Sequence, residues 1–228
     1  MGEEMLARLE WMTLQPKIIL DIGCGTGEMS VQLKQRYPNA SVLSFDLSEE
    51  MTQYARQHHQ LSCCVCADAG KLPLPSQSVD FIFAHFLFPW HPQAKMLLDE
   101  WRRVLRENGL LMFTALGPDT LRQTVATPHL PHLVDMHDLG DSLLHEGFAD
   151  PVLDVNYYTL QFRDKSTMLA ELQTTGMLNP AVTAEDVSST DAVFEVVCGH
   201  AFAPLRQTGY TADRDGMTKI PVDALKKK

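Results

Sequence analysis

The glycine-rich segment ILDIGCGTG, residues 19–27, constrains the fold of this chain more than any other feature. Residues 17–22 form a short, nearly continuous apolar run, which is typical of a strand buried on both faces of a parallel sheet. A helical pattern begins directly behind the glycines, at Glu28. Glycines in such a turn let backbone N–H groups approach a ligand without interference from a Cβ atom. The segment therefore predicts a strand, a ligand-binding turn and a helix, in that order.

Short apolar strands and amphipathic helices alternate along the first half of the chain. Strands are predicted at residues 17–22, 41–45, 61–67, 79–85 and 110–116, and helices at residues 3–12, 28–37, 48–58 and 92–105. This alternation indicates right-handed βαβ units. The second half has helices at residues 138–147 and 166–176 and longer strands at residues 152–162 and 193–203. We predict an α/β fold with a doubly wound, mostly parallel seven-stranded sheet and an antiparallel final strand.

Composition limits the domain organisation and the partners. The 228 residues, 45% of them hydrophobic, supply one core, so we expect a single domain over residues 1–208 and a polar tail over residues 209–228. The formal net charge of −10 argues against broad phosphate neutralisation on a nucleic acid. No apolar run approaches the ~20 residues that span a bilayer, and the first residues lack the pattern of a signal peptide. We expect a cytoplasmic protein with no membrane partner, and its five cysteines are expected to be reduced thiols.

Acidic residues follow the second and third predicted strands, where a nucleoside would be held. The glycine spacing is G-x-G-x-G, whereas the dinucleotide fingerprint is G-x-G-x-x-G, and the carboxylate of Glu28 would repel a pyrophosphate. Asp46 lies 19 residues beyond Gly27, close to the ~20-residue offset at which an acid binds ribose hydroxyls. Asp68 ends the third strand, where it can meet the edge of an adenine. The pattern favours an adenosine without a phosphate and makes NAD the weaker alternative.

The first half resembles the class I S-adenosylmethionine-dependent methyltransferases over residues 17–117, in the segments ILDIGCGTG, ADAGKLPLPSQSVDFIFA and WRRVLRENGLLMFTAL. The second half resembles the BioC-type malonyl-acyl-carrier-protein O-methyltransferases of biotin synthesis, in TALGPDTLRQ, VDMHDLGDSLLHEGFADPVLD and VFEVVCGHAFAP. The resemblance implies S-adenosyl-L-methionine as cofactor, S-adenosyl-L-homocysteine as product, and an acyl-carrier protein carrying a malonyl thioester, or malonyl-CoA, as acceptor. The alternatives are a methyltransferase for another small acceptor, or a noncatalytic or hydroxylase-type assembly protein on the same fold.

The resemblance also implies roles for individual residues. Those expected to contact the cofactor are Asp21, Gly23, Gly25 and Gly27 around its methionine part, Asp46 on the ribose, Asp68 near the adenine amino group, Leu47 and Ala69 along the adenine, and His85 near the sulfonium. Such enzymes have a longer N-terminal segment over the cofactor, so residues 1–16 are expected to form a truncated lid helix. Residues 163–190 are expected to form a helical insertion over the site.

The acceptor of such a reaction needs alignment more than activation. A malonyl carboxylate is already ionised at neutral pH, so catalysis would consist of placing it behind the methyl carbon in a dry pocket. Aromatic and proline residues after the fourth strand are expected to supply the dry wall: Phe86, Phe88, Pro89 and Trp90. Arg122 is the candidate to orient the carboxylate, with His85 and His91 as further candidates, and the alternative for Arg122 is a solvated helix residue.

Two further patterns carry weaker implications. A patch that docks the acidic carrier protein is predicted at Arg102, Arg103, Arg106, Arg163 and Lys165, although a solvated face explains these residues equally well. Metal binding is not predicted at Cys63, Cys64 and Cys66, because no second cysteine pair is near them. The histidines at positions 129, 132, 137 and 145 do not have the spacing of a zinc motif either.

Overall fold

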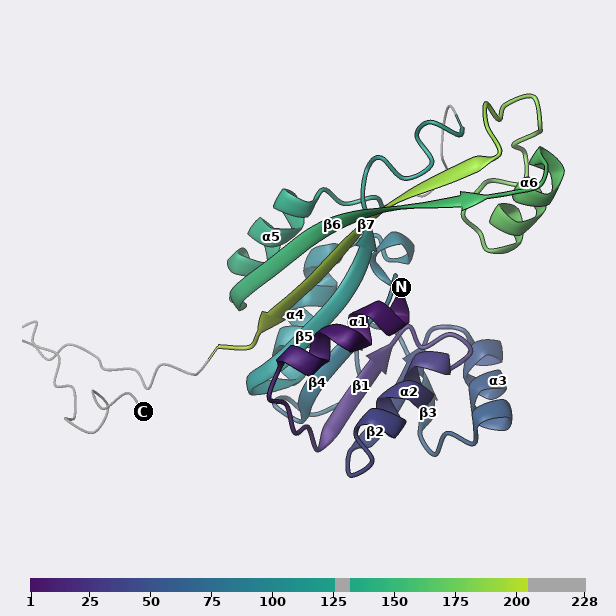
Figure 1. Cartoon of the computed structure of the whole chain (residues 1–228). Coiled ribbons are helices and arrows are strands. Elements are labelled where there is room, and N and C mark those ends of the chain that lie inside the picture. Colours follow the sequence, from purple (N-terminus) through teal and green to yellow (C-terminus); the bar gives the residue numbers. More distant parts are fainter. Residues whose placement is uncertain (126–131, 205–228) are drawn as a thin grey trace, which may run out of the picture.

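One mixed sheet forms the centre of the protein (Figure 1). The computed structural model describes residues 1–125 and 132–204, so the tail predicted over residues 209–228 lies outside the described residues. Within the described residues, seven strands pair in the order β3-β2-β1-β4-β5-β7-β6. The strands are β1 (Ile18–Ile22), β2 (Ser41–Asp46), β3 (Cys64–Cys66), β4 (Val79–Ala84), β5 (Leu105–Leu116), β6 (Ala149–Gln161) and β7 (Asp191–Phe202).

The direction of each strand follows the prediction. Strands β1 to β5 pair in parallel, whereas β7 runs antiparallel to both β5 and β6. The helices are α1 (Gly2–Arg8), α2 (Glu28–Arg36), α3 (Glu49–His59), α4 (Ala94–Val104), α5 (Met136–His145) and α6 (Lys165–Thr174), with short 3-10 turns η1 (Leu9–Trp11) and η2 (Phe88–Trp90). The prediction of a doubly wound, mostly parallel sheet with an antiparallel final strand is confirmed.

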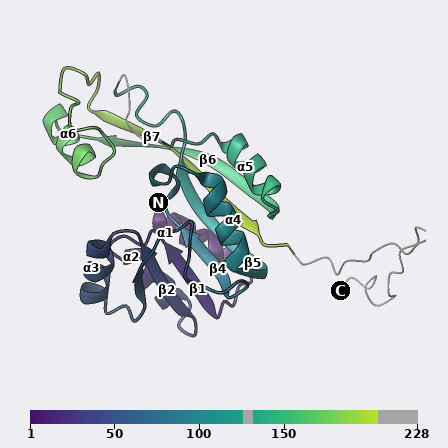
Figure 2. The ribbon, with the colours of Figure 1, turned by 180° about the vertical axis from the view of Figure 1, so that it is seen from behind.

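Alternating side chains of the central strands build a separate core on each face of the sheet. Phe81 and Phe83 of β4 face one core, which α1 and α2 cover (Figure 1). Ile82 and Ala84 of the same strand face the other core, which α4 and α5 cover (Figure 2). Because successive strand residues point to opposite faces, a strand with apolar residues at every position is needed between two helical layers. The apolar run in β4 is therefore explained by burial on both sides.

The first helix lies against the sheet. Its residues Met5 and Leu6 are buried in the first of these cores. Two polar contacts tie the helix to β6: Arg8 Nη2 donates to Asp154 Oδ2 at 2.7 Å, and Tyr158 Oη donates to Glu4 Oε2 at 2.6 Å. None of residues 1–16 lines the cavity at the carboxyl ends of β1 to β4, which is described below. A lid formed by these residues therefore stays a prediction.

Strands β6 and β7 extend past β5 as a two-stranded ribbon that carries α6 at its far end (Figures 1 and 2). The ribbon pairs as far as Gln161 with Asp191, whereas β5 pairs with β7 only from Val196 onward. The connection between the two strands contains the whole of the helical insertion predicted at residues 163–190, and within it Lys165–Thr174 is helical. It packs a third core, in which Met168, Leu172 and Val187 cluster with Leu116 at the end of β5. This ribbon places α6 beyond the carboxyl end of the parallel strands.

The bounds of two strands differ from those predicted from the sequence. The fifth strand begins at Leu105 instead of residue 110, because Leu105 already pairs with Val79 ahead of a register shift. The third strand is confined to Cys64–Cys66. Ser48 caps α3 as its sequence predicts, since its Oγ accepts a hydrogen bond from the backbone nitrogen of Met51 at 3.2 Å.

Candidate functional site

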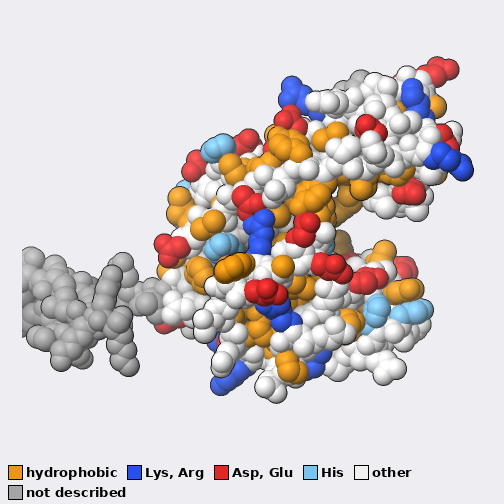
Figure 3. Space-filling model, viewed as in Figure 1, with side chains coloured by type: hydrophobic (Ala, Val, Ile, Leu, Met, Phe, Trp, Pro, Cys, Tyr) orange, Lys and Arg blue, Asp and Glu red, His pale blue; other side chains and the backbone are white. Residues whose placement is uncertain are grey.

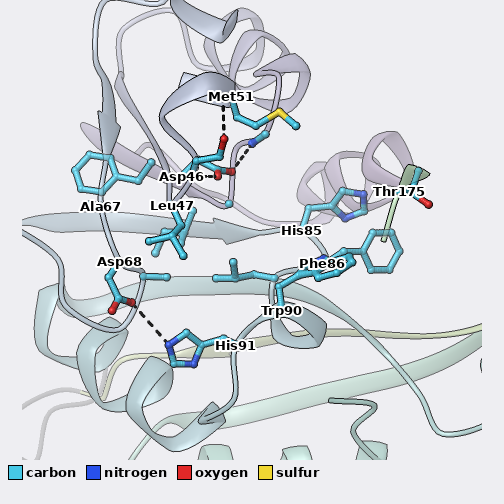
Figure 4. Close-up of a pocket in the computed structure, with 17 residues that line it drawn as sticks. Asp46, Leu47, Met51, Ala67, Asp68, His85, Phe86, Trp90, His91 and Thr175 are labelled. Carbon is cyan, nitrogen blue, oxygen red and sulfur yellow. Dashed lines mark hydrogen bonds and ion pairs between the residues drawn. The ribbon is translucent and has the colours of Figure 1, made fainter. Parts of the chain in front are cut away.

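A cavity of about 520 Å³ opens at the carboxyl ends of β1, β2, β3 and β4 (Figure 4). Strand β1 has β2 on one side and β4 on the other, so the order of the strands reverses at this point. Ligands of open α/β sheets bind in the crevice at such a reversal. The volume lies within the range of small-molecule and cofactor sites. Position and size together make this cavity the candidate site.

The glycine turn forms one wall of the cavity. Gly23 and Gly25 have φ values of 71° and 54°, in the left-handed region that favours glycine. The backbone nitrogens of Gly23 and Cys24 donate to the carbonyl oxygen of Phe45, at 2.7 and 3.0 Å, and this holds the turn against the end of β2. A Cβ atom on Gly25 would meet nothing within 4 Å. The exposed backbone there leaves room for a ligand.

Gly27 has a different role from the one its motif predicts. It lies at the start of α2 with φ of 95°. A Cβ atom on it would come within 2.9 Å of the Cβ atom of Ala55, so the residue is small because α2 and α3 pack closely there. It does not line the cavity. The spacing of the glycines therefore serves helix packing as well as ligand access.

Asp46 is held in place by two backbone donors. Its Oδ2 accepts from the nitrogen of Gly25 and its Oδ1 accepts from the nitrogen of Ser48, each at 2.9 Å (Figure 4). A carboxylate oxygen has two lone pairs, so each oxygen retains one for a ligand. A pair of neighbouring hydroxyls, as on a ribose, matches this arrangement.

Asp68 lies at another side of the cavity, beside apolar walls. Its Oδ1 accepts from the nitrogen of Gly70 at 2.8 Å and lies 3.7 Å from Nε2 of His91 (Figure 4). Leu47, which is 75% exposed at the rim, and the buried Ala69 line the same part of the cavity. The Asp68 carboxylate, a hydrogen-bond acceptor beside apolar side chains, suits the amino group on the edge of an adenine ring.

Asp21, by contrast, lies behind the glycine turn and does not line the cavity. Its side chain is 1% exposed and accepts from Ser30 Oγ at 2.5 Å, while Ser30 Oγ lies 2.7 Å from Ser44 Oγ. Burial raises the pKa of Asp21 to about 7, and the negative charge of Asp46 adds to the rise. The position of Asp21 therefore does not support the predicted contact with the methionine part of a cofactor. Its hydrogen bond to Ser30, and that of Ser30 with Ser44, join β1 to α2 and β2.

His85 lies at the side of the cavity opposite Asp68 (Figure 4). Its Nδ1 is 2.9 Å from Thr114 Oγ1, and its ring lies 4.3 Å from that of Phe86. Burial lowers the pKa of His85 to about 4, so the ring is neutral at physiological pH. A neutral ring can lie near a positively charged ligand without repelling it.

The segment after β4 divides between the cavity and the core. Phe86 and Trp90 line the cavity, and the ring of Trp90 lies against Gly176, just after α6. Phe88 is 1% exposed, with its ring against those of Trp101 and Phe113, and Pro89 is also buried. Phe88 and Pro89 therefore belong to the core, which corrects the expectation that they wall the pocket.

Arg122 lies away from the cavity. Its side chain is 73% exposed and pairs with Asp119 at 2.9 Å. The loop after β5 turns back along β7, where the nitrogens of Gly117 and Leu121 donate to the carbonyl oxygens of Glu195 and Val193. This path takes Arg122 away from the carboxyl ends of β1 to β4. Its position supports the solvated alternative, and the role predicted for it in orienting a carboxylate has no support in the structure.

A second, smaller cavity of about 240 Å³ adjoins the first, and sequence reasoning missed it. The two cavities share Phe86 and Thr175. Apart from Glu171 and Thr175, the side chains that line the smaller cavity are apolar and come mainly from the ends of β5 and β6, the start of β7 and the segment around α6. Figure 3 shows hydrophobic side chains in the hollow between the ribbon and the body of the sheet.

The described part of the chain contains neither a cluster of metal-ligating side chains nor a membrane-spanning helix. Across residues 1–125 and 132–204, no group of three or more His, Cys, Asp or Glu side chains is arranged to hold a metal ion, and His129 lies outside these ranges. Cys64 is buried, Cys63 is partly buried and Cys66 is exposed, all as free thiols. In the same ranges, no helix has the length and apolar character needed to cross a membrane.

Comparisons with known proteins agree on one class. Residues 20–113 match the family described as "Methyltransferase domain". A malonyl-[acyl-carrier protein] O-methyltransferase from Gallionella capsiferriformans is 34% identical, over 95% of this chain and 86% of that protein. The solved YcgJ protein from Bacillus subtilis covers 90% of this chain and all of its own, with a TM-score of 0.65 and 15% identity. Phosphoethanolamine N-methyltransferase 2 from Haemonchus contortus, solved with S-adenosyl-L-methionine, covers 89% of this chain and 53% of its own, with a TM-score of 0.59 and 17% identity.

The matched domain and the relative from Gallionella capsiferriformans define a class I S-adenosylmethionine-dependent methyltransferase, whose cofactor is S-adenosyl-L-methionine. Within this class, the chain belongs to the malonyl-[acyl-carrier protein] O-methyltransferase family. The cavity fits the cofactor, because an open glycine backbone, the paired oxygens of Asp46 and the acceptor on Asp68 follow one another around it. We propose that Gly23, Gly25, Asp46, Leu47, Asp68, Ala69 and His85 contact it.

The role proposed for Asp46 is tested by calorimetry with S-adenosyl-L-homocysteine. Asp46→Ala should weaken binding by roughly 1.5–3 kcal/mol, which is the range for a lost hydrogen bond to a charged group. Asp141→Ala, at an exposed position of α5, serves as the matched control and should leave the affinity unchanged. Equal affinities for Asp46→Ala and the control would show that Asp46 does not bind the ribose.

Burial of Asp21 predicts a pH-dependent stability. Its pKa is about 7 in the folded protein against an ordinary value of 3.8, so the folded state holds this proton more tightly than the unfolded state. The contribution of protonated Asp21 to the free energy of unfolding is therefore fully present below about pH 4. It is lost as the pH rises towards 7, by at most about 1.4 kcal/mol per pH unit. Urea unfolding of the wild type and of Asp21→Asn between pH 4.5 and 7.5 measures the difference.

The wild type must be compared with Asp21→Asn because the titration of His85 changes stability with pH in the opposite direction to that of Asp21. The pKa of His85 is lowered, so it favours the folded state increasingly as the pH rises from about 4 to 6.5 in both proteins. Asp21→Asn should gain stability relative to the wild type as the pH rises. A difference between the two that does not change with pH would contradict the assignment of a raised pKa to Asp21.

Proposed function

We propose that this chain methylates the free carboxylate of a malonyl thioester carried by acyl-carrier protein, a reaction of biotin synthesis. The name of the relative from Gallionella capsiferriformans supports this acceptor. When bound, the cofactor supplies a methyl group on a positively charged sulfur. Transfer of that methyl group to a carboxylate oxygen would break the carbon–sulfur bond and leave its electron pair on sulfur, in S-adenosyl-L-homocysteine.

The observation that carries the proposal is the weak basicity of His85, the histidine beside the point where the two cavities meet. His85 lies beside Phe86, where the two cavities meet, and its lowered pKa of about 4 makes it a poor proton acceptor at neutral pH. A hydroxyl or ammonium acceptor would have to lose a proton, whereas a carboxylate is already ionised. The site is therefore better suited to a carboxylate than to an alcohol or an amine.

The distribution of charge supports the same acceptor. Among the described residues, no Lys or Arg side chain lines either cavity. The carboxylates of Asp46 and Asp68 lie on the side assigned to the adenosine, and Glu171 and Met1 are among the residues that line the second cavity. The positive sulfur would then attract an incoming carboxylate. Opposite charges attract more strongly in a dry, low-dielectric site, and the apolar second cavity would provide such surroundings. We propose that Phe86 and Trp90 exclude water there.

The docking surface for the carrier protein stays a prediction. Arg103 binds Glu100 at 2.6 Å, Arg106 binds Asp80 at 2.6 Å, and Arg163 binds Asp164 at 2.9 Å. Lys165 donates to the carbonyl oxygens of Ala184 and Val187. These contacts within the chain would compete with an acidic partner, so any docking role requires the side chains to exchange partners.

A transfer assay tests the proposed function. The chain is incubated with methyl-labelled S-adenosyl-L-methionine and malonyl-acyl-carrier protein, and the carrier protein should acquire a base-labile methyl ester. Acetyl-acyl-carrier protein is the matched control, because it has the same thioester and carrier but no carboxylate, and it should remain unlabelled. Malonyl-CoA, tested in parallel, shows whether the carrier protein is required.

Calorimetry separates the possible failures of this assay. Binding of S-adenosyl-L-homocysteine without label in either malonyl thioester would overturn the proposed acceptor, and would favour another small acceptor or a noncatalytic role. Equal labelling of the acetyl and malonyl carrier proteins would show that methyl transfer is directed to the protein and not to the malonyl carboxylate.

A further inference from the structure

Thr114 joins the two residues that lie where the cavities meet. It is fully buried in β5, and its Oγ1 accepts a hydrogen bond from the backbone nitrogen of Phe86 at 2.9 Å. The same oxygen lies 2.9 Å from Nδ1 of His85. One hydroxyl therefore contacts both the backbone after β4 and the ring of the histidine.

The backbone conformation of Phe86 fixes one half of this arrangement. Its φ is 54°, in the left-handed region that residues other than glycine seldom adopt. The N–H of Phe86, at the end of β4, donates to Thr114. A backbone N–H can only donate, so the oxygen of Thr114 must act as its acceptor. One lone pair of the hydroxyl is thereby occupied.

The hydrogen of the same hydroxyl needs an acceptor. Among the described residues, the structure gives it one candidate, Nδ1 of His85. If Nδ1 carried a hydrogen, the threonine oxygen would face two donors, and its own hydrogen would remain unpaired in a buried place. An unpaired buried donor costs about 1–3 kcal/mol. The arrangement with every group paired has Thr114 donating to Nδ1, and the hydrogen of the neutral ring is then on Nε2.

We propose that Thr114 is a positioning residue that holds His85 in the tautomer with its hydrogen on Nε2, so that the cavity receives a hydrogen-bond donor. The two ring nitrogens lie on different edges of the ring, so with Nδ1 turned to the buried Thr114, Nε2 is the nitrogen left for the cavity that His85 lines. The inference rests on the proposed function for its ligand, which is an oxygen of the acceptor carboxylate.

The tautomer matters because of the charge that the ring meets. An N–H group binds a carboxylate oxygen, whereas a bare ring nitrogen at the same place would repel it. The ring also stays neutral because it is buried. His85 therefore orients an anion without placing a second positive charge beside the sulfur. A guanidinium such as that of Arg122 would orient the anion equally well but would also repel the cofactor.

Nitrogen NMR of the full chain, labelled with ¹⁵N-histidine, tests this proposal. The two tautomers give distinct Nδ1 and Nε2 shifts, and the signals of His85 are assigned by their loss in His85→Gln. The wild type and Thr114→Ser, which keeps the hydroxyl, should both have the hydrogen on Nε2. Thr114→Val, which is nearly isosteric but has no hydroxyl, should lose this preference. Thr124→Val, at another buried threonine, is the matched control and should retain it.

Kinetics provide the second readout. Thr114→Val should lower kcat for malonyl transfer by about tenfold to a hundredfold, the range for a weakened hydrogen bond to a charged group, with an unchanged Kd for S-adenosyl-L-homocysteine. Thr114→Ser should restore most of the rate. A structural role alone would lower cofactor affinity and rate together, without a change of tautomer.

Three outcomes decide the matter. A wild-type His85 with its hydrogen on Nδ1 would overturn the proposal, and so would a Thr114→Val protein that folds and keeps the wild-type tautomer. If Thr114→Val does not fold, the wild-type and Thr114→Ser spectra still test the assignment. A tautomer that depends on Thr114, in a chain that does not methylate malonyl thioesters, would support the positioning role and contradict only the proposed function.

Discussion

The two hydrogen bonds that the backbone donates to Asp46 hold the candidate site together. Through them one carboxylate joins Gly25, in the turn after β1, to Ser48, at the start of α3. The carboxyl ends of β1 and β2 are thus fixed to each other, with the carboxylate oxygens of Asp46 at the edge of the cavity. Together with the hydrogen bonds from Gly23 and Cys24 to Phe45, this contact fixes the glycine backbone relative to the adenosine side of the cavity and the first turn of α3.

The ribbon and α6 add an apolar cavity beside this nucleoside site. The ribbon of β6 and β7 carries α6 to the carboxyl end of the sheet, where Thr175 and Phe86 border both cavities. Asp46 and Asp68 lie on one side, and a neutral histidine with mostly apolar neighbours lies on the other. Such a division suits a reaction in which a polar cofactor meets an anion that must be freed of water.

Much of the fold could be predicted from the sequence, because strands buried on both faces leave apolar runs and glycines mark the turn. Asp46 and Asp68 also follow from their places at strand ends, and both line the cavity. Position along the chain does not determine which way a side chain faces. Asp21, the third predicted carboxylate, points into the protein, and Arg122 follows a loop that turns along β7. The apolar second cavity and Thr114 leave no local signal, since their partners are distant in sequence.

A crystal structure of the chain with S-adenosyl-L-homocysteine tests the central claim most directly, because it locates the ligand relative to Asp46. The account predicts both ribose hydroxyls within hydrogen-bonding distance of the Asp46 carboxylate, with the adenine between Leu47 and Ala69 and its amino group near Asp68. A ligand bound elsewhere, or with its ribose turned away from Asp46, would contradict it.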